Sequence, residues 1–418
     1  MILQQNAMSS ELDTRPRFAS NGVNESTLHA HRFLLRAGFS IANVFAWIFI
    51  FEYFYILSGN VARAFAGVVI LYALAQIITI VATPISAAHL RRGTKHSIIW
   101  GAIAAAGAFV LLGTILSGYF FVDGGSTSFL WGIAGFAVLI GAYRALYWIP
   151  YKLTRAATKP YLRMGSYFEM LIALMPLFAG LTIASVPFAA AQLLFGTAAL
   201  IVLSAIPVLF FEDARERFSW SYVYTFKQLL KRKNYGLVLR ALLDGLQGAA
   251  LFLVWPLAVF LIVEWSYFTL GIVFSMTLLI ILLLRGAYGW ILGSVGLRDS
   301  TSVHVVVSVS AWIARFAAGT PFGVIVADSY SYVTEPERDT RADPFSFEQA
   351  SDRGAFLDEY TALKEIALAL GRIKLCVVVF LLTFIFALPV VLAIALGVAA
   401  AASGISVLVA RRGSTPTY

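Results

Sequence analysis

Charged residues are scarce in this chain. Asp, Glu, Lys and Arg make up 13% of its 418 residues, whereas hydrophobic residues make up 60% and the mean hydropathy is +0.82. A typical soluble domain is about one quarter charged and roughly one half apolar. The composition therefore excludes a water-soluble globule and indicates an integral membrane protein.

Residues that form disulfides, metal sites or nucleotide sites are also few. The single cysteine, Cys376, excludes an internal disulfide and a cysteine-cluster metal site. None of the five histidines is paired with an acidic residue at the spacing of metal ligands, and no P-loop pattern occurs. We therefore expect no catalytic residues, no metal and no cofactor.

The net charge of +9 comes mainly from short connections between apolar runs. Lys and Arg gather in alternate connections, at residues 1–36, 90–96, 151–163 and 227–234, whereas an intervening connection such as 122–128 carries none. An excess of Lys and Arg marks the cytoplasmic side of a membrane protein. This pattern argues against a nucleic-acid-binding face. It predicts a multi-pass protein of the cytoplasmic (plasma) membrane with both termini inside.

Hydrophobic runs give the number of membrane crossings. A crossing helix needs about 20 apolar residues, because each residue rises 1.5 Å through roughly 30 Å of hydrocarbon. Ten runs qualify: 37–57, 64–88, 98–121, 129–150, 165–186, 189–210, 237–263, 267–292, 366–388 and 389–410. Residues 302–334 are long for one span and short for two, but only two crossings place Arg411 and Arg412 on the basic side. We predict twelve spans with a hairpin turning near residues 319–321, and eleven spans is the alternative.

The polar segment 211–236 divides the chain into two apolar blocks of equal length, 37–210 and 237–410. Equal blocks suggest duplication of a six-helix unit. The predicted fold is therefore all-α: a polytopic membrane protein of twelve transmembrane helices in two pseudo-symmetric six-helix bundles. Residues 1–36 and 411–418 are expected to be cytoplasmic tails, 211–236 a cytoplasmic connector, and about 335–360 a charged cytoplasmic loop.

Three short stretches resemble a known family. Residues 86–95 read Ser-Ala-Ala-His-Leu-Arg-Arg-Gly-Thr-Lys, and residues 293–298 repeat the small-x-x-x-Leu-Arg pattern in the second block. The first stretch resembles Gly-x-x-x-Asp-Arg-x-Gly-Arg-Lys, the signature of the major facilitator superfamily, with Leu90 in place of the aspartate. Residues 176–180, Pro-Leu-Phe-Ala-Gly, are similar to the Pro-x-x-Gly-Gly motif of its exporters.

The resemblance implies a divergent secondary transporter of this superfamily, in which two bundles rock around a small-molecule site. It also implies an inner gate built from the fourth, fifth, tenth and eleventh spans. Because Leu90 replaces the aspartate, the family's usual charge relay is not expected at this loop.

Polar groups inside the spans are the candidate site residues, because an ionised group costs about 2.5–3.5 kcal/mol there and should face a cavity or a partner. Glu52, about 22 Å into the first span, could bind a cationic solute or carry a proton; alternatively it reaches the interface from an aromatic belt. Asp244 and Gln247 form a polar stripe, and Trp255 faces either the cavity or lipid. The substrate and coupling candidates are Glu52, Tyr53, Tyr147, Trp148, Asp244, Gln247 and Trp255.

Charge pairs are the second group of candidates. Arg144 and Glu169 can meet near the cytoplasmic ends of the fourth and fifth spans, either as a gate or as a static pair. Glu365 and Arg372 share a helical face at the corresponding place in the second block. Three further pairings are expected: Arg240 with Asp244, or Asp244 with Arg285, and Arg315 with Asp328.

The leading hypothesis is a secondary active transporter that moves a small solute by alternating access. A proton or solute gradient would drive it, and coupling to protons is expected. The expected partners are a small-molecule substrate, a proton and membrane lipid, with the chain as a monomer and no nucleic acid. Two alternatives remain: a membrane-embedded enzyme acting on lipid, and a transporter-like receptor or scaffold that moves nothing.

Overall fold

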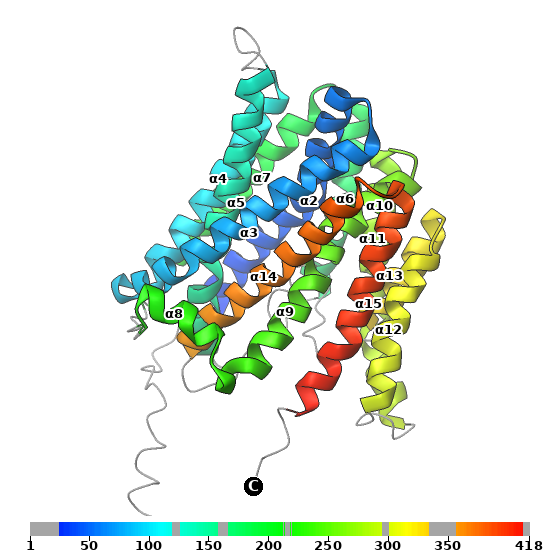
Figure 1. Cartoon of the computed structure of the whole chain (residues 1–418). Helices are drawn as coiled ribbons and strands as arrows, with labels where there is room; N and C mark the ends of the chain where they lie inside the picture. Colours follow the sequence, from blue (N-terminus) through cyan, green and yellow to red (C-terminus); the bar gives the residue numbers. More distant parts are fainter. Residues whose placement is uncertain are drawn as a thin grey trace, which may run out of the picture.

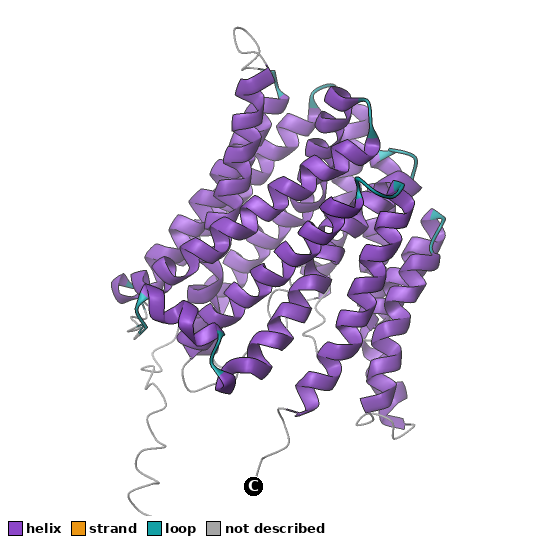
Figure 2. Ribbon diagram, viewed as in Figure 1, coloured by secondary structure: helices purple, strands orange, loops and turns teal. Residues whose placement is uncertain are grey.

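The computed structural model describes residues 25–118, 126–157, 166–211, 213, 218, 220–294, 301–333 and 357–412. Every regular element within these residues is a helix, and Figures 1 and 2 show that the helices form a bundle. The all-helical, polytopic membrane fold predicted from the sequence is confirmed.

The first half consists of six long helices. They are α2 (Glu25–Ser58), α3 (Val61–His89), α4 (Thr94–Leu116), α5 (Ser126–Ala157), α6 (Ser166–Ser185) and α7 (Ala189–Val208), with a short 3₁₀ turn, η1 (Leu90–Arg92), after α3. Helix α2 begins well before residue 37, so part of the predicted tail is helical. The reason is an amphipathic pattern, because Leu28, His31, Arg32 and Leu35 recur at helical spacing and are all buried.

The connector contains α8 (Tyr222–Leu229), whose first turn is capped by Ser221, and the 3₁₀ turn η2 (Arg232–Asn234). The second half follows: α9 (Tyr235–Ala249), the π-helical segment η3 (Ala250–Val254), α10 (Trp255–Ile262), α11 (Tyr267–Ser294), α12 (Thr301–Ala317), α13 (Pro321–Val333), α14 (Leu357–Leu382) and α15 (Leu388–Arg412). Helices α9 and α10 form one span with η3 between them. The wide π turn ends at Val254, two residues before Pro256, which cannot donate a backbone hydrogen bond.

The region between residues 302 and 333 is a hairpin. Helices α12 and α13 pack side by side, and their turn lies at the end opposite α8, while α15 finishes at the α8 end (Figure 1). Nine segments of the described chain are long and apolar enough to cross a membrane. With α12, α13 and α14 they make the twelve predicted crossings, six in each half. The end that carries α8 is called the connector end below.

The halves meet most extensively at two helix pairs: α3 packs on α14, and α6 packs on α11. Glycines allow the second contact, because a Cβ on Gly180 would lie 2.4 Å from the carbonyl oxygen of Tyr267, and one on Gly271 would lie 2.5 Å from that of Pro176. Close backbone approach through small residues is typical of membrane helices. The exporter-like stretch 176–180 therefore forms part of the contact between the halves.

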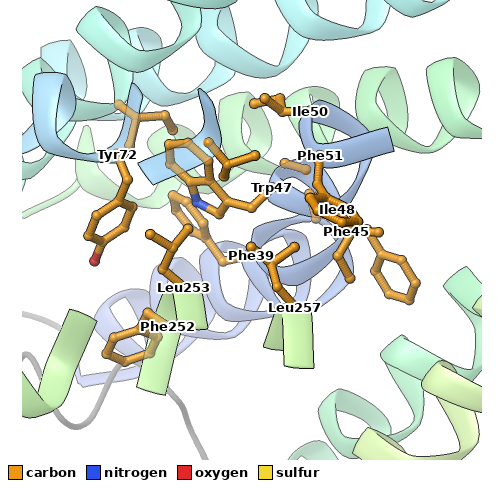
Figure 3. Close-up of a cluster of buried hydrophobic side chains, with 14 of the residues drawn as sticks. Phe39, Phe45, Trp47, Ile48, Ile50, Phe51, Tyr72, Phe252, Leu253 and Leu257 are labelled. Carbon is orange, nitrogen blue, oxygen red and sulfur yellow. The ribbon is translucent and has the colours of Figure 1, made fainter. Parts of the chain in front are cut away.

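A hydrophobic core runs through both halves without a break. Phe45 and Trp47 of α2 belong to the same buried cluster as Leu253 of η3 and Leu257 of α10. Figure 3 shows these side chains converging between α2 and the π segment. The two halves are therefore packed against each other at this level.

Candidate functional site

A buried polar layer crosses the middle of the interface between the halves. Gln76 lies about 20 Å from either end of α3. Its Oε1 atom accepts a hydrogen bond of 3.1 Å from Nη1 of Arg144 on α5 and another of 3.1 Å from Nη1 of Arg372 on α14. All three side chains are buried. One amide oxygen thus connects two arginines that belong to different halves.

The two guanidinium groups are close enough to repel each other. Two bonds of 3.1 Å to the same oxygen place the Nη1 atoms at most twice that distance, 6.2 Å, apart. At an effective dielectric constant of about 20, two like charges about 6 Å apart repel by about 3 kcal/mol. Gln76 supplies an acceptor but no negative charge.

Neighbouring groups shape the layer. The guanidinium of Arg144 lies 5.5 Å from the ring centroid of Tyr72, a cation–π arrangement. On the other side, Arg372 lies against Gly248 of α9, where a Cβ would be in ordinary van der Waals contact with the Nε atom, at 3.5 Å. The Tyr72 hydroxyl and Gln76 Nε2 are buried and have no hydrogen-bond partner among the described residues. Two unsatisfied donors therefore lie one turn apart on α3, beside the arginines.

A salt bridge joins the halves at the connector end. Lys152, near the end of α5, places its Nζ atom 2.6 Å from Oε1 of Glu365 in the first part of α14. The side chains are 10% and 5% exposed. The structure thus gives Glu365 a partner in the first half, whereas the sequence grouped it only with Arg372 of its own helix.

An apolar contact lies beside this salt bridge. Leu90, at the position of the family's aspartate, is fully buried in a cluster with Ile149, Phe218 and Ala362 of α14. The side chain therefore packs across to the second half where the family's loop has a charge. The departure from the signature replaces an electrostatic contact by a hydrophobic one.

Glu52 and Tyr267 join the halves at the opposite end. The Tyr267 hydroxyl, at the first residue of α11, donates a hydrogen bond to Oε2 of Glu52 in the last two turns of α2. Beside them, the ring of Trp265 lies 5.3 Å from Phe51 and 4.8 Å from Tyr55. Glu52 is half-buried and bonded to the other half, which favours the interior orientation over the interfacial one.

Arg144 and Glu169 each lie against helices other than the two that their predicted pairing would join. Arg144 contacts Gln76 and Tyr72 of α3. Glu169 is buried in the first turn of α6, where the helix N-terminus favours a carboxylate, and α6 packs on α11 and α2. The pairing of Arg144 with Glu169 stays a prediction.

The polar stripe on α9 contacts the last helix. Ser406 of α15 donates a hydrogen bond of 2.7 Å to Oδ1 of Asp244. Gln247 is fully buried and its Nε2 donates to the carbonyl oxygen of Leu243 at 3.4 Å, while Arg240 is exposed. The side chain of Arg285 lies outside the described residues. The expected partners of Asp244 on α9 and α11 therefore stay predictions.

Arg315 and Asp328 come together across the hairpin. Nε of Arg315 lies 2.7 Å from Oδ1 of Asp328, and Nε1 of Trp255 donates to both carboxylate oxygens, at 3.0 and 2.9 Å. All three residues are buried. Trp255 therefore faces neither lipid nor an open cavity: it anchors the hairpin to α10, directly after the π segment.

The aromatic candidates of the first half contact their own half. Tyr53 stacks on Phe129 with ring centroids 3.8 Å apart. Nδ1 of His31 donates to the carbonyl oxygen of Ser204 at 2.6 Å, so the neutral ring accepts from the Tyr147 hydroxyl at Nε2, at 2.8 Å. These bonds connect α2, α5 and α7. Trp148, the next residue on α5, is also buried.

Sequence reasoning missed four residues of these contacts: Gln76, Lys152, Tyr267 and His31. Gln76 had a signal, because an uncharged amide within the apolar run ALAQIITI is costly unless its polar atoms are bonded. Lys152 resembled an ordinary topology-setting charge, and His31 lay in the segment expected to be a tail. Tyr267 opens a span, where tyrosine is common for interfacial reasons alone.

The helices and the contacts between them define a class of protein. The chain is a multi-pass membrane protein of two six-helix halves, with buried polar contacts between the halves at three levels. Two halves of six helices each are the arrangement that the resemblance in the sequence implied.

Comparison with known proteins gives the same fold. No protein-family model and no curated protein sequence matches the chain. A bacterial homologue of the iron transporter ferroportin, solved in an outward-facing state, matches with a TM-score of 0.60 at 16% identity, over 94% of this chain and 99% of that chain. A D-xylose-proton symporter matches with a TM-score of 0.59 at 13% identity, over 92% and 96%.

A third solved structure is the peptide transporter POT in complex with sulfate. It matches with a TM-score of 0.58 at 12% identity, over 94% of this chain and 96% of that chain. At these identities the likeness concerns the fold. The three named structures are transporters, and none is an enzyme.

Proposed function

We propose that the chain is a secondary active transporter that moves a small solute across the membrane by alternating access, coupled to protons. The observation that carries this proposal is the set of polar contacts between the two halves. Lys152 and Glu365 meet at the connector end, Gln76 meets Arg372 in the middle, and Tyr267 meets Glu52 at the opposite end. Two halves that rock around a central site need breakable contacts on both sides of it.

The connector-end gate consists of the Lys152–Glu365 salt bridge and the apolar cluster around Leu90. Opening the site toward this end separates the ion pair and exposes the cluster to water. Water replaces the partners of the two charges when they separate, which limits the cost of opening. A charge pair at the edge of an apolar cluster is therefore suited to repeated opening and closing.

The opposite gate consists of Glu52, Tyr267 and the aromatic rings around Trp265. A hydrogen bond to an ionised carboxylate is about twice as strong as one between neutral groups. Protonation of Glu52 therefore weakens its bond to Tyr267 and releases α2 from α11. This step couples opening of the gate to proton uptake, and one of the solved structures with this fold is described as a proton symporter.

The orientation follows from the basic connections. The connector end carries Lys95, Lys152, Lys231 and Arg232. We therefore place this end in the cytoplasm, as the positive-inside rule requires. Glu52 then titrates with the outer medium when the outer gate opens.

Proton movement driven by a solute tests the proposal. Purified protein in sealed vesicles with a pH-sensitive dye inside is offered a library of sugars, peptides, carboxylates and amines, one at a time. We expect at least one solute to move protons with the wild type, and the same solute to move without protons, or not at all, with Glu52→Gln.

A matched control is Glu264→Gln, because Glu264 is exposed in the turn beside the same gate. This variant is expected to behave as the wild type. Proton coupling that survives intact in Glu52→Gln contradicts the role of Glu52. A library in which no solute moves, with or without protons, contradicts the transporter function.

A further inference from the structure

We propose that the exposed surface of the connector, over residues 222–235, binds the anionic headgroups of a phospholipid bilayer. This role goes beyond the proposed transport and does not depend on it. The surface comprises α8, η2 and the first residue of α9, and is called the connector patch below. Figure 1 shows α8 at one end of the bundle, beside the ends of α3 and α14.

The outward-facing residues of the connector patch differ from those of a helix surrounded by water. Thr225 and Gln228 of α8 are buried, whereas Val223 is 61% exposed and Leu230, just after the helix, is 90% exposed. A connector in water would expose its polar residues and bury its apolar ones. Exposed apolar groups are instead typical of a helix that lies in the plane of the membrane interface, with these groups among the lipid headgroups.

The position of Tyr222 places the patch at the border of the apolar layer. Its hydroxyl donates a hydrogen bond of 3.4 Å to the carbonyl oxygen of Val81 on α3. Ile77, Val81 and Ile85 recur at every fourth position and are exposed, so this face of α3 meets lipid. Val81 lies eight residues, or about 12 Å, before His89, the last residue of α3. A tyrosine at this depth is typical of the membrane–water boundary.

Contacts to both halves hold the connector patch at this position. The ring centroid of Trp220, directly before α8, lies 6.1 Å from that of Tyr224 in α8 and 6.2 Å from that of Tyr360 in α14. Tyr222 bonds to α3 of the first half, and Tyr360 belongs to the second half. The patch is therefore fixed beside the membrane where the two halves meet.

The charge of the connector patch specifies the kind of lipid. Four of its fourteen residues are Lys or Arg, and none is Asp or Glu. Nζ of Lys231 lies 2.9 Å from the Tyr224 hydroxyl, and this hydrogen bond, together with the charges of Lys231 and Lys233, lowers the pKa of the phenol. Negative charge is thus favoured at this surface. An anionic headgroup would supply it, whereas a zwitterionic headgroup carries no net charge.

A fluorescent reporter on the connector patch tests this assignment in the purified full-length protein. Leu230→Cys in a Cys376→Ala background carries an environment-sensitive dye, and the protein is held in micelles of a neutral detergent. Phosphatidylglycerol is titrated into the micelles, with phosphatidylcholine of the same acyl chains as the control. We expect only phosphatidylglycerol to shift the dye emission to shorter wavelength. Sodium chloride at about 1 M should suppress the shift, because it reduces the screening length to about 3 Å.

Two matched pairs of substitutions locate the lipid. Arg232→Gln with Lys233→Gln removes two exposed charges from the patch. This pair should raise the half-saturating concentration of phosphatidylglycerol about 25-fold, since each Lys or Arg near an anionic surface contributes about fivefold. Arg63→Gln with Lys374→Gln removes two exposed charges elsewhere, at the start of α3 and on α14, and should leave that concentration unchanged.

Three results overturn the assignment. The first is a dye that responds to phosphatidylcholine as strongly as to phosphatidylglycerol, or to neither lipid. The second is a response that survives unchanged in Arg232→Gln with Lys233→Gln, or that the control pair weakens equally. The third comes from soluble polyglutamate, which presents negative charge without a bilayer: a response to polyglutamate and none to phosphatidylglycerol would assign the patch to an acidic protein instead.

Discussion

Removal of the Glu365 carboxylate is the sharpest perturbation of the proposed connector-end gate. Glu365→Gln leaves the ammonium group of Lys152 without its 2.6 Å partner at a place where the two side chains are only 10% and 5% exposed. Breaking a fully buried ion pair costs about 3–5 kcal/mol. Because Lys152 lies near the end of α5, its long side chain can reach water, and about 2 kcal/mol is a reasonable value here.

The lost ion pair destabilises only the closed state, because the pair is already broken when the gate is open. A change of about 2 kcal/mol corresponds to about a 30-fold increase in the ratio of open to closed molecules. Cys376 reports this ratio, because it is the chain's single cysteine and is buried on α14, one turn beyond Arg372. We expect its reaction with N-ethylmaleimide to quicken about 30-fold in Glu365→Gln.

Two further variants test whether Lys152 and Glu365 act as a gate pair. Lys374→Gln, an exposed change on the same helix, should leave the reaction rate of Cys376 unchanged. The exchange Lys152→Glu with Glu365→Lys restores an ion pair in the opposite sense and should return the rate toward the wild type. If the exchanged protein reacts as fast as Glu365→Gln, the two residues do not act as a gate pair.

Three further predictions concern stability and packing. Asp328→Asn should lower stability by about 3 kcal/mol, because it leaves the buried charge of Arg315 without its partner, and a melting curve measures the change. Gly180→Ala places a Cβ 2.4 Å from the carbonyl oxygen of Tyr267 and should lower the melting temperature, whereas Gly196→Ala, with nothing within 4 Å, should not. Tyr147→Phe removes the bond to His31 and should cost about 1 kcal/mol, measured in the same way; an unchanged melting temperature would contradict the tie between α2 and α5.

The fold could be predicted in most respects because membrane insertion leaves a strong pattern in the sequence. Apolar run length and the alternation of basic connections gave the crossings, including the hairpin from α12 to α13. The start of α2 was missed because His31, Arg32 and Arg36 made the segment look polar. In the structure these side chains lie on a buried face, which a count of apolar residues cannot detect.

The sequence predicted the site only as a set of charged and polar residues within apolar runs, without their partners. Arg144, Glu365 and Arg372 were recognised as costly charges, but their partners depend on how the two halves meet. Gln76 and Arg372 are 296 positions apart in the sequence, and no helical periodicity relates them. Contacts within one helix or one hairpin, such as that of Arg315 with Asp328, could be inferred from spacing, whereas contacts between the halves required the structure.

Motif reading was informative even where the motif was incomplete. Leu90 departs from the family signature, yet it lies in the inter-half contact where that signature would act. Gly180 and Pro176 resemble the exporter motif, and they form the close contact of α6 with α11. In both cases the sequence indicated the position of an interface, and the structure gave its chemistry.

Distances across the two ends of the protein test the proposed alternating access most directly. Spin labels at Asn60 and Glu264 span the halves at the end opposite the connector, and labels at Arg92 and Lys233 span them at the connector end; all four positions are exposed. In a Cys376→Ala background, a change from mildly alkaline to mildly acidic pH should lengthen one distance and shorten the other. Distances that both stay fixed, or that change together in the same direction, would contradict alternating access by these two halves.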